Sequence, residues 1–558
     1  MIRVDSSRLR STLLLSGIAI IVAALYARFG LLVHQTAVNL PIWDDFDSVL
    51  FFLNQYIQTD SLNEKLSLIF SQHNEHRIVI NHLLTLVSYW CFGEVNFLFL
   101  IWCAVFALLT VPFVIASSMT STLSALVIAT AVLLQPQYGD GLNWVTTCLA
   151  SFSLVLLAAL CGRIINQPNT WWLLSFPLSA ITCFGQGNGI ALPLCLGFAL
   201  LINGYYRRAG LVALWSVIVV TLYFHGYHFS ERAQRIPEMI AQYPTVLEYG
   251  FTLVGASLGF SDVKTSMWVG VVLTIITIGL FCQRRFRANT TLVTVILFLF
   301  LSAALNTAAR SLSGAQWAIS PGRYTIISSG IITCVSLGLI IVFQRYSRSL
   351  NITFGTLALA FNLCSYDRYR YAVEDLYIRA LNDFALYVIF GEGLTYPWPD
   401  RGVPIFETSL KNGVFSLPLD DLALGRIVPP PPSRVAPPKG QARIGINRVQ
   451  KGKSYLVIEG WGFLKQCSSA DTHLNLLFHG KDEQIAIEPL RKKRSDVGEI
   501  FHSEDRIHAG FLGIIPLSTL KEEEMYRLNL LISCNGAQYT QSTRYSVSRT
   551  EILGPQRD

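Results

Sequence analysis

Three carboxylates occupy four positions of one polar segment, at Asp44, Asp45 and Asp47, with Trp43 and Phe46 beside them. Carboxylates this close repel one another unless a cation or a substrate compensates their charge. A single aspartate could mark the start of a helix, where an acid complements the helix dipole, but three exceed what that role needs. We therefore predict that Asp44 or Asp45 acts as a general base and that Asp47 contacts a substrate. The pair Asp44 and Asp45 could also hold a divalent metal; no other cofactor is indicated.

A second polar cluster closes the same segment at residues 72–77, with the sequence Gln-His-Asn-Glu-His-Arg. Its side chains His73, Glu75, His76 and Arg77 can bind a sugar hydroxyl, a phosphate or a metal, although their spacing is not that of a zinc protease. The alternative is a polar turn at a membrane surface. Because acids begin the segment and bases end it, we predict that both clusters contribute to substrate binding.

Arg310, Arg323 and Tyr324 lie around a turn at residues 320–322, together with Asn306. A guanidinium forms paired hydrogen bonds to phosphate, so these residues are candidates for binding a lipid phosphate, and Arg323 is favoured over Arg310. Arginines that only anchor lipid headgroups are the alternative.

Two short motifs supply the remaining candidates for substrate binding. Asn143 and Trp144 belong to a segment, residues 135–144, with the aromatic and amide content of a sugar site or of an aromatic belt at the membrane surface. Gln186 and Asn188 alternate with glycines in a Gln-Gly-Asn-Gly motif. A tight turn is the favoured interpretation of this motif, and close approach of the backbone to a ligand is the other.

The composition places these residues in a membrane protein. Of 558 residues, 52% are hydrophobic and only 14% are charged, with a mean hydropathy of +0.44, whereas soluble domains carry about 25% charge. Recurring apolar runs predict a polytopic α-helical membrane protein with about eleven spans. The predicted spans are residues 11–33, 95–117, 121–135, 146–163, 171–185, 189–203, 210–228, 266–283, 289–306, 323–343 and 350–366.

Arginine clusters in short loops set the predicted orientation. They occur at residues 207–208, 284–287 and 345–348, and the positive-inside rule assigns them to the cytoplasm. The first span is then an uncleaved anchor with a cytoplasmic N-terminus, and the chain after residue 366 and every polar segment named above lie outside. For successive spans to alternate in direction, residues 77–92 must form a juxtamembrane or re-entrant helix and not a span. An error in the number of the other spans is the alternative. No basic face with interleaved aromatics indicates nucleic-acid binding.

Beyond the membrane module of residues 1–366, the chain has two predicted parts. Residues 367–439 form a connector with a helical stretch and a stiff proline-rich linker at 429–438. Residues 440–548 predict a β-sandwich, with strands at 455–459, 474–478, 484–487, 526–532 and 538–542. If this domain is exported, Cys467 and Cys534 are a candidate disulfide.

A first span, a long outer loop (residues 34–94) with an acidic motif, and a helix along the membrane together resemble the GT-C superfamily of membrane glycosyltransferases. The resemblance covers residues 1–366 in architecture and only short motifs in sequence. Asp44 and Asp45 match the position of the family's catalytic acids, and residues 73–77 match that of a basic or His-Pro-Pro element, without its prolines. The tail resembles the carbohydrate-binding β-sandwich modules appended to some of these enzymes.

The resemblance implies an inverting glycosyltransferase that uses a polyprenyl-phosphate-linked sugar, with the phosphate held by Arg323 together with Arg77 or Arg310. The acceptor would be a periplasmic glycan such as lipopolysaccharide O-antigen, or a protein. The location would be the bacterial inner membrane, with the C-terminal domain in the periplasm. Three alternatives stay open: an oligosaccharide ligase or polymerase with a lipid diphosphate donor, a transporter or flippase for a lipid-linked sugar, and a glycan-binding protein without enzymatic activity.

Overall fold

The computed structural model describes residues 6–229, 236–320, 322–391, 393–419, 422, 424, 426–429, 441–535 and 537–554. The chain forms two compact units, one of residues 1–374 with 404–416 and the other of residues 375–403 with 417–558. Helix α18 (Ser347–Phe390) continues from the first unit into the second, so the predicted boundary at residue 366 falls inside a helix. Most of the predicted proline-rich linker lies outside the described residues.

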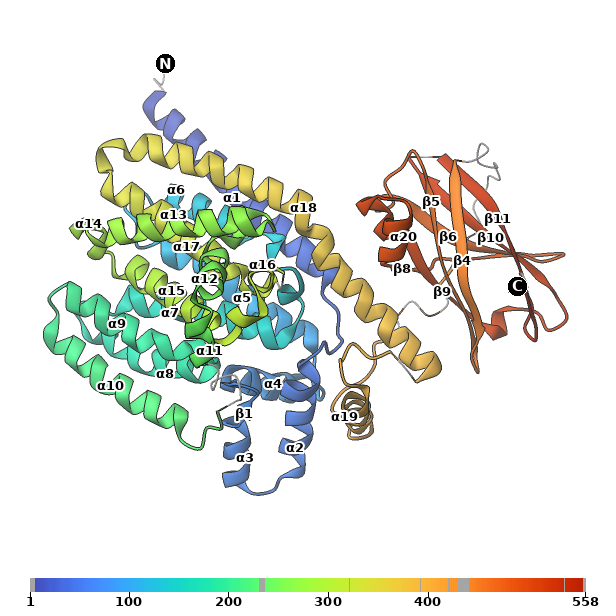
Figure 1. Ribbon diagram of the computed structural model, residues 1–558, viewed down its shortest axis with the longest axis horizontal. Helices are drawn as coiled ribbons and strands as arrows, with labels where there is room; N and C mark the ends of the chain where they lie inside the picture. Colours follow the sequence, from blue (N-terminus) through green and yellow to red (C-terminus); the bar gives the residue numbers. More distant parts are fainter. Residues whose placement is uncertain are drawn as a thin grey trace, which may run out of the picture. The chain divides into compact units, whose positions relative to one another are not determined.

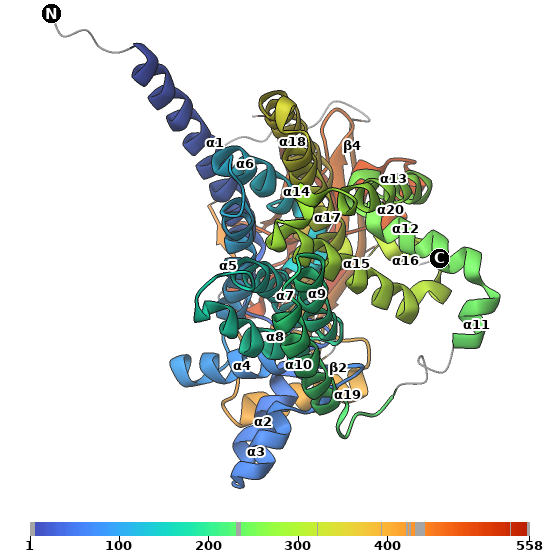
Figure 2. The ribbon, with the colours of Figure 1, turned by 90° about the vertical axis from the view of Figure 1, so that its left-hand side faces the viewer.

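The first unit is a bundle of apolar helices (Figures 1 and 2). Among the described residues, seven helices are long and apolar enough to cross a membrane, which confirms the predicted membrane character. They are α1 (Ser6–Thr36), α5 (Phe97–Ala116), α7 (Val145–Ile164), α10 (Tyr206–Phe224), α13 (Val263–Phe281), α15 (Thr290–Arg310) and α17 (Thr325–Val342).

The other predicted spans take different forms. Residues 350–366 are the first part of α18, and three further segments are helices of only 11 or 12 residues: α6 (Thr122–Leu133), α8 (Ser175–Gly185) and α9 (Ala191–Ile202). The total number of spans therefore stays a prediction.

Helix α4 (Val79–Phe92) occupies the segment that was expected to lie along the membrane. It buries the polar side chains of Asn81 and His82 and exposes Leu83, Val87 and Trp90. The spacing of the exposed residues places them on one helix face. A helix with its polar face inward and its apolar face outward suits a lipid environment; its placement along the membrane stays a prediction.

Helix α12 (Tyr243–Gly259) was not expected, because the sequence analysis placed no helix between the predicted spans at 210–228 and 266–283. The Tyr249 hydroxyl donates to Asn306 Oδ1 at 2.7 Å, and the backbone N–H of Ser257 donates to Ser328 Oγ at 3.0 Å. These partners lie near the C-terminal end of α15 and the N-terminal end of α17. The helix therefore packs across one end of the bundle.

The polar segments gather at one end of the bundle and the arginine-rich loops at the other. At the first end, Asn143 Nδ2 donates to the backbone oxygen of Thr36, the last residue of α1, at 2.9 Å. At the second, Asn203 Nδ2 donates to the backbone oxygen of Arg287 at 2.8 Å. The grouping of segments expected from loop charge is present in the structure, and which end faces the cytoplasm stays a prediction.

Shorter elements connect these helices. They are η1 (Phe46–Phe51), α2 (Phe52–Gln58), α3 (Leu62–Ile69), β1 (Gln72–His73), β2 (His76–Arg77), η2 (Pro136–Leu142), η3 (Thr170–Leu174), η4 (Gly187–Ile190), α11 (Ile236–Ala241), α14 (Arg284–Arg287), η6 (Ser311–Ser313), α16 (Gln316–Ile319), η7 (Gly322–Tyr324), η8 (Gln344–Tyr346) and α19 (Pro399–Lys411).

The second unit contains two antiparallel sheets, with strand orders β12-β11-β10-β6-β7-β3 and β4-β5-β9-β8. Apolar residues from both sheets form one core, which confirms the predicted β-rich domain. Cys467 and Cys534 form the expected disulfide. The strands are β3 (Ile427–Val428), β4 (Ala442–Lys451), β5 (Tyr455–Leu464), β6 (His473–His479), β7 (Gln484–Ile487), β8 (Leu490–Lys492), β9 (Gly510–Pro516), β10 (Tyr526–Cys534), β11 (Ala537–Val547) and β12 (Ile552–Leu553); a short helix, α20 (Ser495–Ile500), and two 3₁₀ turns, η9 (Glu504–Ala509) and η10 (Leu517–Thr519), lie between them.

Strand β9 was not predicted from the sequence, because both of its faces are buried. Phe511 and Ile515 belong to the core between the sheets. Leu512 and Ile514 pack on the opposite face against Ala385 of α18. A strand covered on both faces is apolar throughout and shows no alternation.

Candidate functional site

Asp45 is fully buried and fastens the acidic loop to the start of α7. Its Oδ1 accepts hydrogen bonds from the backbone N–H of Thr146 at 2.8 Å and from the Thr146 hydroxyl at 2.6 Å, and its Oδ2 accepts one from the N–H of Ile42 at 3.1 Å. Burial raises the pKa of Asp45 to about 7, against the opposing effect of these hydrogen bonds. Both oxygens are used within the protein, so Asp45 positions the loop.

Asp44 has the opposite environment. Its side chain is 34% exposed, and its Oδ2 lies 3.9 Å from Nε2 of His73 on the β1–β2 hairpin. Trp43 and Asn74, which adjoin these two residues, both adopt a positive φ, of 48° and 50°. Left-handed backbone at non-glycine residues costs free energy and gathers at functional sites. The acidic loop and the hairpin therefore meet at Asp44 and His73, each of which adjoins a residue in the left-handed backbone region.

His76, on the same hairpin, is packed against the Gln-Gly-Asn-Gly turn. A Cβ atom at Gly187 would lie 2.5 Å from Nδ1 of His76, so only glycine leaves room for the imidazole ring. Burial lowers the pKa of His76 to about 4, which keeps the ring neutral near pH 7. Its Nδ1 is buried without a hydrogen-bond partner among the described residues. The motif is therefore a turn, as favoured in the sequence, and its glycine permits close approach of a protein side chain; approach of the backbone to a ligand stays a prediction.

Arg77 is held by backbone carbonyl groups. Its Nε donates to the oxygen of Tyr223 at 2.8 Å and its second terminal nitrogen to that of His225 at 2.6 Å; the other terminal nitrogen donates to Phe70. The side chain is buried. These bonds tie the hairpin to the end of α10, which is a structural role in place of the expected contact with phosphate.

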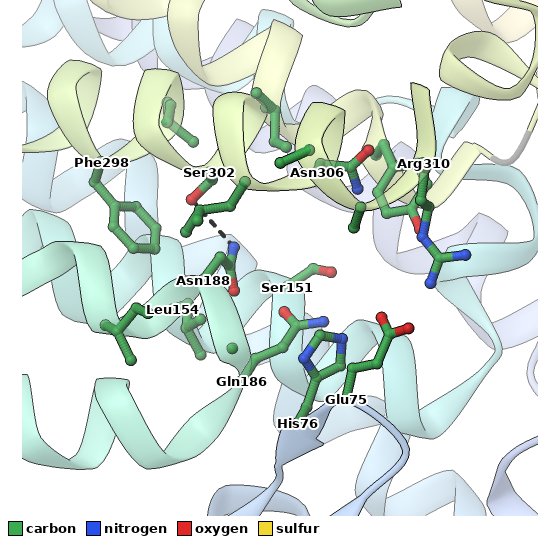
Figure 3. Close-up of a pocket in the computed structure, with 18 of the residues that line it drawn as sticks. Glu75, His76, Ser151, Leu154, Gln186, Asn188, Phe298, Ser302, Asn306 and Arg310 are labelled. Atoms are coloured by element: carbon green, nitrogen blue, oxygen red, sulfur yellow. Dashed lines mark hydrogen bonds between the residues drawn. The ribbon is translucent and has the colours of Figure 1, made fainter. Parts of the chain in front are cut away.

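A cavity of about 810 Å³ opens beside the hairpin, between α7, α15, α17 and the chain from α10 to α12 (Figure 3). In Figure 3, Glu75, His76 and Arg310 lie at one end of it and Leu154 and Phe298 at the other. The candidate residues that line it are Glu75, His76, Gln186, Asn188, Arg310, Arg323 and Tyr324. The candidates that do not line it are Asp44, Asp45, Asp47, His73, Arg77, Asn143 and Trp144.

The cavity joins a charged end to a long apolar wall. Leu154, Phe298, Leu299, Ile326 and Ile327 contribute to that wall from the three apolar helices. The chain from α10 to α12 adds aromatic and aliphatic side chains. Such a lining suits an amphiphile with a polar headgroup and a hydrocarbon chain.

Arg310 and Arg323 supply positive charge at the polar end. Within the described part of the chain neither guanidinium forms an ion pair, and Nε of Arg323 is buried without a hydrogen-bond partner. The Arg323 guanidinium lies 4.9 Å from the ring centre of Trp144 and 5.0 Å from that of Tyr324. Burial raises the pKa of Asp140, and the charge of Arg323 opposes that rise. The two arginines are therefore positioned without carboxylates that neutralise them by direct pairing.

Trp144 links this arginine to the acidic loop. Its ring packs edge-on against Trp43, with 4.9 Å between the ring centres. Trp43 precedes Asp44, so a continuous chain of contacts runs from Arg323 to the acidic loop. Asn143, the neighbour of Trp144, is buried and bonded to Thr36.

Asn188 crosses the cavity wall to α15. Its Nδ2 lies 3.1 Å from Ser302 Oγ (Figure 3), while its Oδ1 is buried without a partner among the described residues. Asn306, named with the two arginines in the sequence, also lines the cavity, and so do Ser151 and Ser302, which the sequence did not identify. Single polar residues inside apolar spans gave no pattern that could have identified them.

A metal bridging Asp44 and Asp45 finds little support in this geometry. In the described ranges, no three His, Cys, Asp or Glu side chains come together as metal ligands. Asp45 already accepts three hydrogen bonds, and Asp47 lies on η1, outside the cavity lining.

The fold and this site define a membrane-embedded helical protein with an amphiphilic cavity and a β-rich C-terminal domain. The sequence matches no protein-family model and no curated protein.

Proposed function

We propose that this protein is a glycosyltransferase of the GT-C type, which moves a sugar from a polyprenyl-phosphate donor to a hydroxyl of a glycan or protein acceptor. The observation that carries the proposal is the cavity in which two arginines without ion-pair partners adjoin a long apolar wall. An isoprenoid chain would occupy the apolar part and its phosphate the arginine end.

The arginines would act on the leaving group. As the bond between the anomeric carbon and the phosphate oxygen breaks, negative charge grows on the departing polyprenyl phosphate. Fixed positive charges aimed at a developing anion stabilise the transition state more than the ground state. Arg323 is the better placed of the two, because Trp144 and Tyr324 support its guanidinium.

Asp44 would be the general base. It would take the proton from the acceptor hydroxyl while that oxygen bonds to the anomeric carbon on the face opposite the phosphate, which inverts the configuration. Its half-exposed position beside His73 leaves it accessible to an acceptor. Asp45 would hold the loop through Thr146 and Ile42.

The division of charge between the two ends supports an outward-facing site in the bacterial inner membrane. The arginine-rich loops would face the cytoplasm under the positive-inside rule. The cavity and the C-terminal domain would then face the periplasm, where the Cys467–Cys534 disulfide persists. Nucleotide sugars are scarce outside the cytoplasm, so a lipid-linked donor is the natural supply, and an O-antigen-like glycan is a suitable acceptor.

A ligase or polymerase with a lipid diphosphate donor is the second candidate. The observation that favours it is the presence of two arginines at the polar end, because two guanidinium groups can hold two phosphates. A transporter is less well supported, since its charged residues would lie at mid-membrane depth, whereas these acids and bases gather at one end of the bundle.

The test is sugar transfer in membranes that contain the full-length protein and cell-envelope glycans. Radiolabelled polyprenyl-phosphate sugar is supplied in one arm and a polyprenyl-diphosphate oligosaccharide in the other. We expect transfer from the first donor, a loss of about 10²–10⁴-fold with Asp44→Asn, and no change with Asp60→Asn, an exposed acid between α2 and α3.

Two results would count against the proposal. Full transfer by Asp44→Asn at normal protein levels would remove Asp44 as the base, and transfer only from the diphosphate donor would establish the second candidate. The orientation is tested separately with a reporter that is active only in the periplasm, fused after Ser416 at the end of the first unit. An inactive fusion at normal protein levels would reverse the proposed orientation.

A further inference from the structure

A second cavity, of about 730 Å³, lies at the arginine-rich end of the bundle. It is formed by the loop at residues 117–121, the end of α7, the start of α15 and the end of α17. The same three helices line the first cavity through their other parts. On α15 the lining of the second cavity ends at Thr291 and that of the first begins at Phe298. With a rise of 1.5 Å per residue, these two positions are roughly 10 Å apart along the helix axis, so the cavities are separate and lie toward opposite ends of the bundle.

The lining of this second cavity is polar and positively charged. Arg163 and Arg285 are its charged side chains, and the residues that line it include no aspartate or glutamate. Serine, threonine, asparagine and glutamine make up most of the rest. The surrounding loops at residues 203–208, 282–289 and 343–349 also lack acidic residues. A ligand with negative charge would find no competing carboxylate there.

Hydrogen-bond donors remain available on both arginines. Arg163 Nε donates to Ser117 Oγ at 3.3 Å, and one terminal nitrogen of Arg285 donates to the backbone oxygen of Val342 at 3.5 Å. A guanidinium has five N–H groups, so most are unused within the described chain. The hydroxyl oxygen of Ser121 is buried and has no partner among the described residues.

The start of α15 adds a further favourable field. Asn289 caps this helix by accepting a hydrogen bond from the N–H of Leu292 at 3.1 Å. The next two residues, Thr290 and Thr291, line the cavity. The N-terminal end of a long helix carries partial positive charge and favours phosphate groups.

We propose that this cavity binds the phosphate headgroup of an anionic phospholipid from the leaflet at that end of the bundle. The chemistry it recognises is a phosphate ester held by Arg163, Arg285 and neighbouring hydroxyls. Ile340 and Ile341 in the lining offer apolar surface for the beginning of the acyl chains, which a free phosphate ion would not use. Basic pockets between membrane helices are recognised sites for such headgroups. The proposal does not depend on the chemistry of the first cavity.

The experiment measures lipid retained by the full-length protein after transfer from phosphatidylcholine membranes that contain a small fraction of phosphatidylglycerol. Native mass spectrometry counts the anionic lipids that remain bound. We expect the double change Arg163→Gln and Arg285→Gln to weaken retention by about fivefold for each arginine. The matched control is Arg207→Gln with Arg348→Gln, which removes the same charge from exposed positions at the same end, outside the cavity lining.

Three outcomes decide the proposal. Selective loss in the cavity variant supports it, and equal loss in both double variants overturns it in favour of general surface attraction. The retention assay is repeated with millimolar inorganic phosphate. If phosphate abolishes the difference in retained lipid between the wild type and the cavity variant, the site binds a free anion and the lipid assignment is overturned. If the double variant does not fold, Arg285→Gln alone gives the same readout, because Arg285 is exposed on α14.

Discussion

The two cavities are built on the same three helices, α7, α15 and α17, yet their chemistry differs. The first has arginines, a histidine and a glutamate in its lining and an apolar wall, and ring contacts through Trp144 and Trp43 connect its Arg323 to the loop that carries Asp44. The second has arginines, hydroxyls and amides, and its lining residues carry no carboxylate. Both suit a phosphate, but only the first has a group that can accept a proton. Under the two proposals, phosphate recognition alone would not be enough for transfer, and the carboxylate would distinguish the reactive site from the binding site.

Among the changes that compare the two ends of the bundle, the largest expected effect is at Arg323 of the first cavity. Arg323→Ala should lower sugar transfer by about 10²–10³-fold, because one charge-stabilising group is removed from the leaving phosphate. Arg348→Ala, at the opposite end, should leave transfer at the wild-type rate. Initial rates with labelled donor measure both. Equal rates in the two variants would remove the functional difference between the two ends.

The next effect separates the two neighbouring acids. Asp45→Ala should lower the free energy of unfolding by about 1–3 kcal/mol, because buried donors of Ile42 and Thr146 lose their acceptor. Asp44→Ala, at a partly exposed position, should change it by at most about 0.5 kcal/mol. Thermal unfolding in detergent measures the difference. Similar shifts in both variants would contradict the assignment of Asp45 to positioning.

The pH dependence of stability should have contributions of opposite sign from Asp45 and His76. The folded-state pKa of Asp45 is raised from 3.8 to about 7, so its contribution is present at low pH and is lost as pH rises through about 7. The pKa of His76 is lowered from 6.5 to about 4, so its contribution is present above 6.5 and is lost as pH falls toward 4. Each slope is at most about 1.4 kcal/mol per pH unit.

Unfolding temperatures between pH 4 and 8 test these signs. Between pH 4 and 6.5 the two contributions oppose each other. Asp45→Asn should leave only the His76 contribution, so that stability falls as pH decreases below 6.5. His76→Asn should leave only the Asp45 contribution, so that stability falls as pH increases toward 7. The same pH profile in both variants would contradict the opposite signs assigned to the two residues.

The smallest expected effect concerns the support of Arg323. Trp144→Leu removes the aromatic face next to the guanidinium, which is worth about 1 kcal/mol at a partly desolvated site. We expect the KM for the donor to rise by about fivefold, with kcat little changed. Trp171→Leu is the matched control, because Trp171 is an exposed tryptophan on η3, before the start of α8, and does not line the first cavity. An equal rise in both would mean that the effect is one of bulk hydrophobicity.

Local sequence patterns predicted the grouping of the chain's polar segments better than the roles of single residues. The arginines in short loops and the apolar runs were enough to separate the two ends, because charge placement and helix length act locally. Helix α12 was missed because its three glycines, its proline and its polar residues are typical of a loop. Its partners, such as Ser328 and Asn306, lie far along the chain.

The difference between Asp44 and Asp45 could not be read from the sequence for the same reason. The two residues are adjacent and chemically identical, and Thr146, which donates hydrogen bonds to Asp45 and not to Asp44, is 101 residues away from Asp45. Arg77 was likewise predicted to bind phosphate, but its guanidinium donates hydrogen bonds to the carbonyl oxygens of Tyr223 and His225. Candidate residues can be recognised by type, whereas their roles depend on distant partners.

The glycine beneath the His76 ring offers a way to perturb the site genetically without deleting any of its functional groups. A single added methyl group, in Gly187→Ala, would meet Nδ1 of His76 at 2.5 Å and force the ring or the turn to move. Every acid, base and amide of the cavity would remain, and only their spacing would change. Such an allele is expected to be temperature-sensitive, and its suppressors would reveal which neighbouring residues set the spacing between the hairpin and α15.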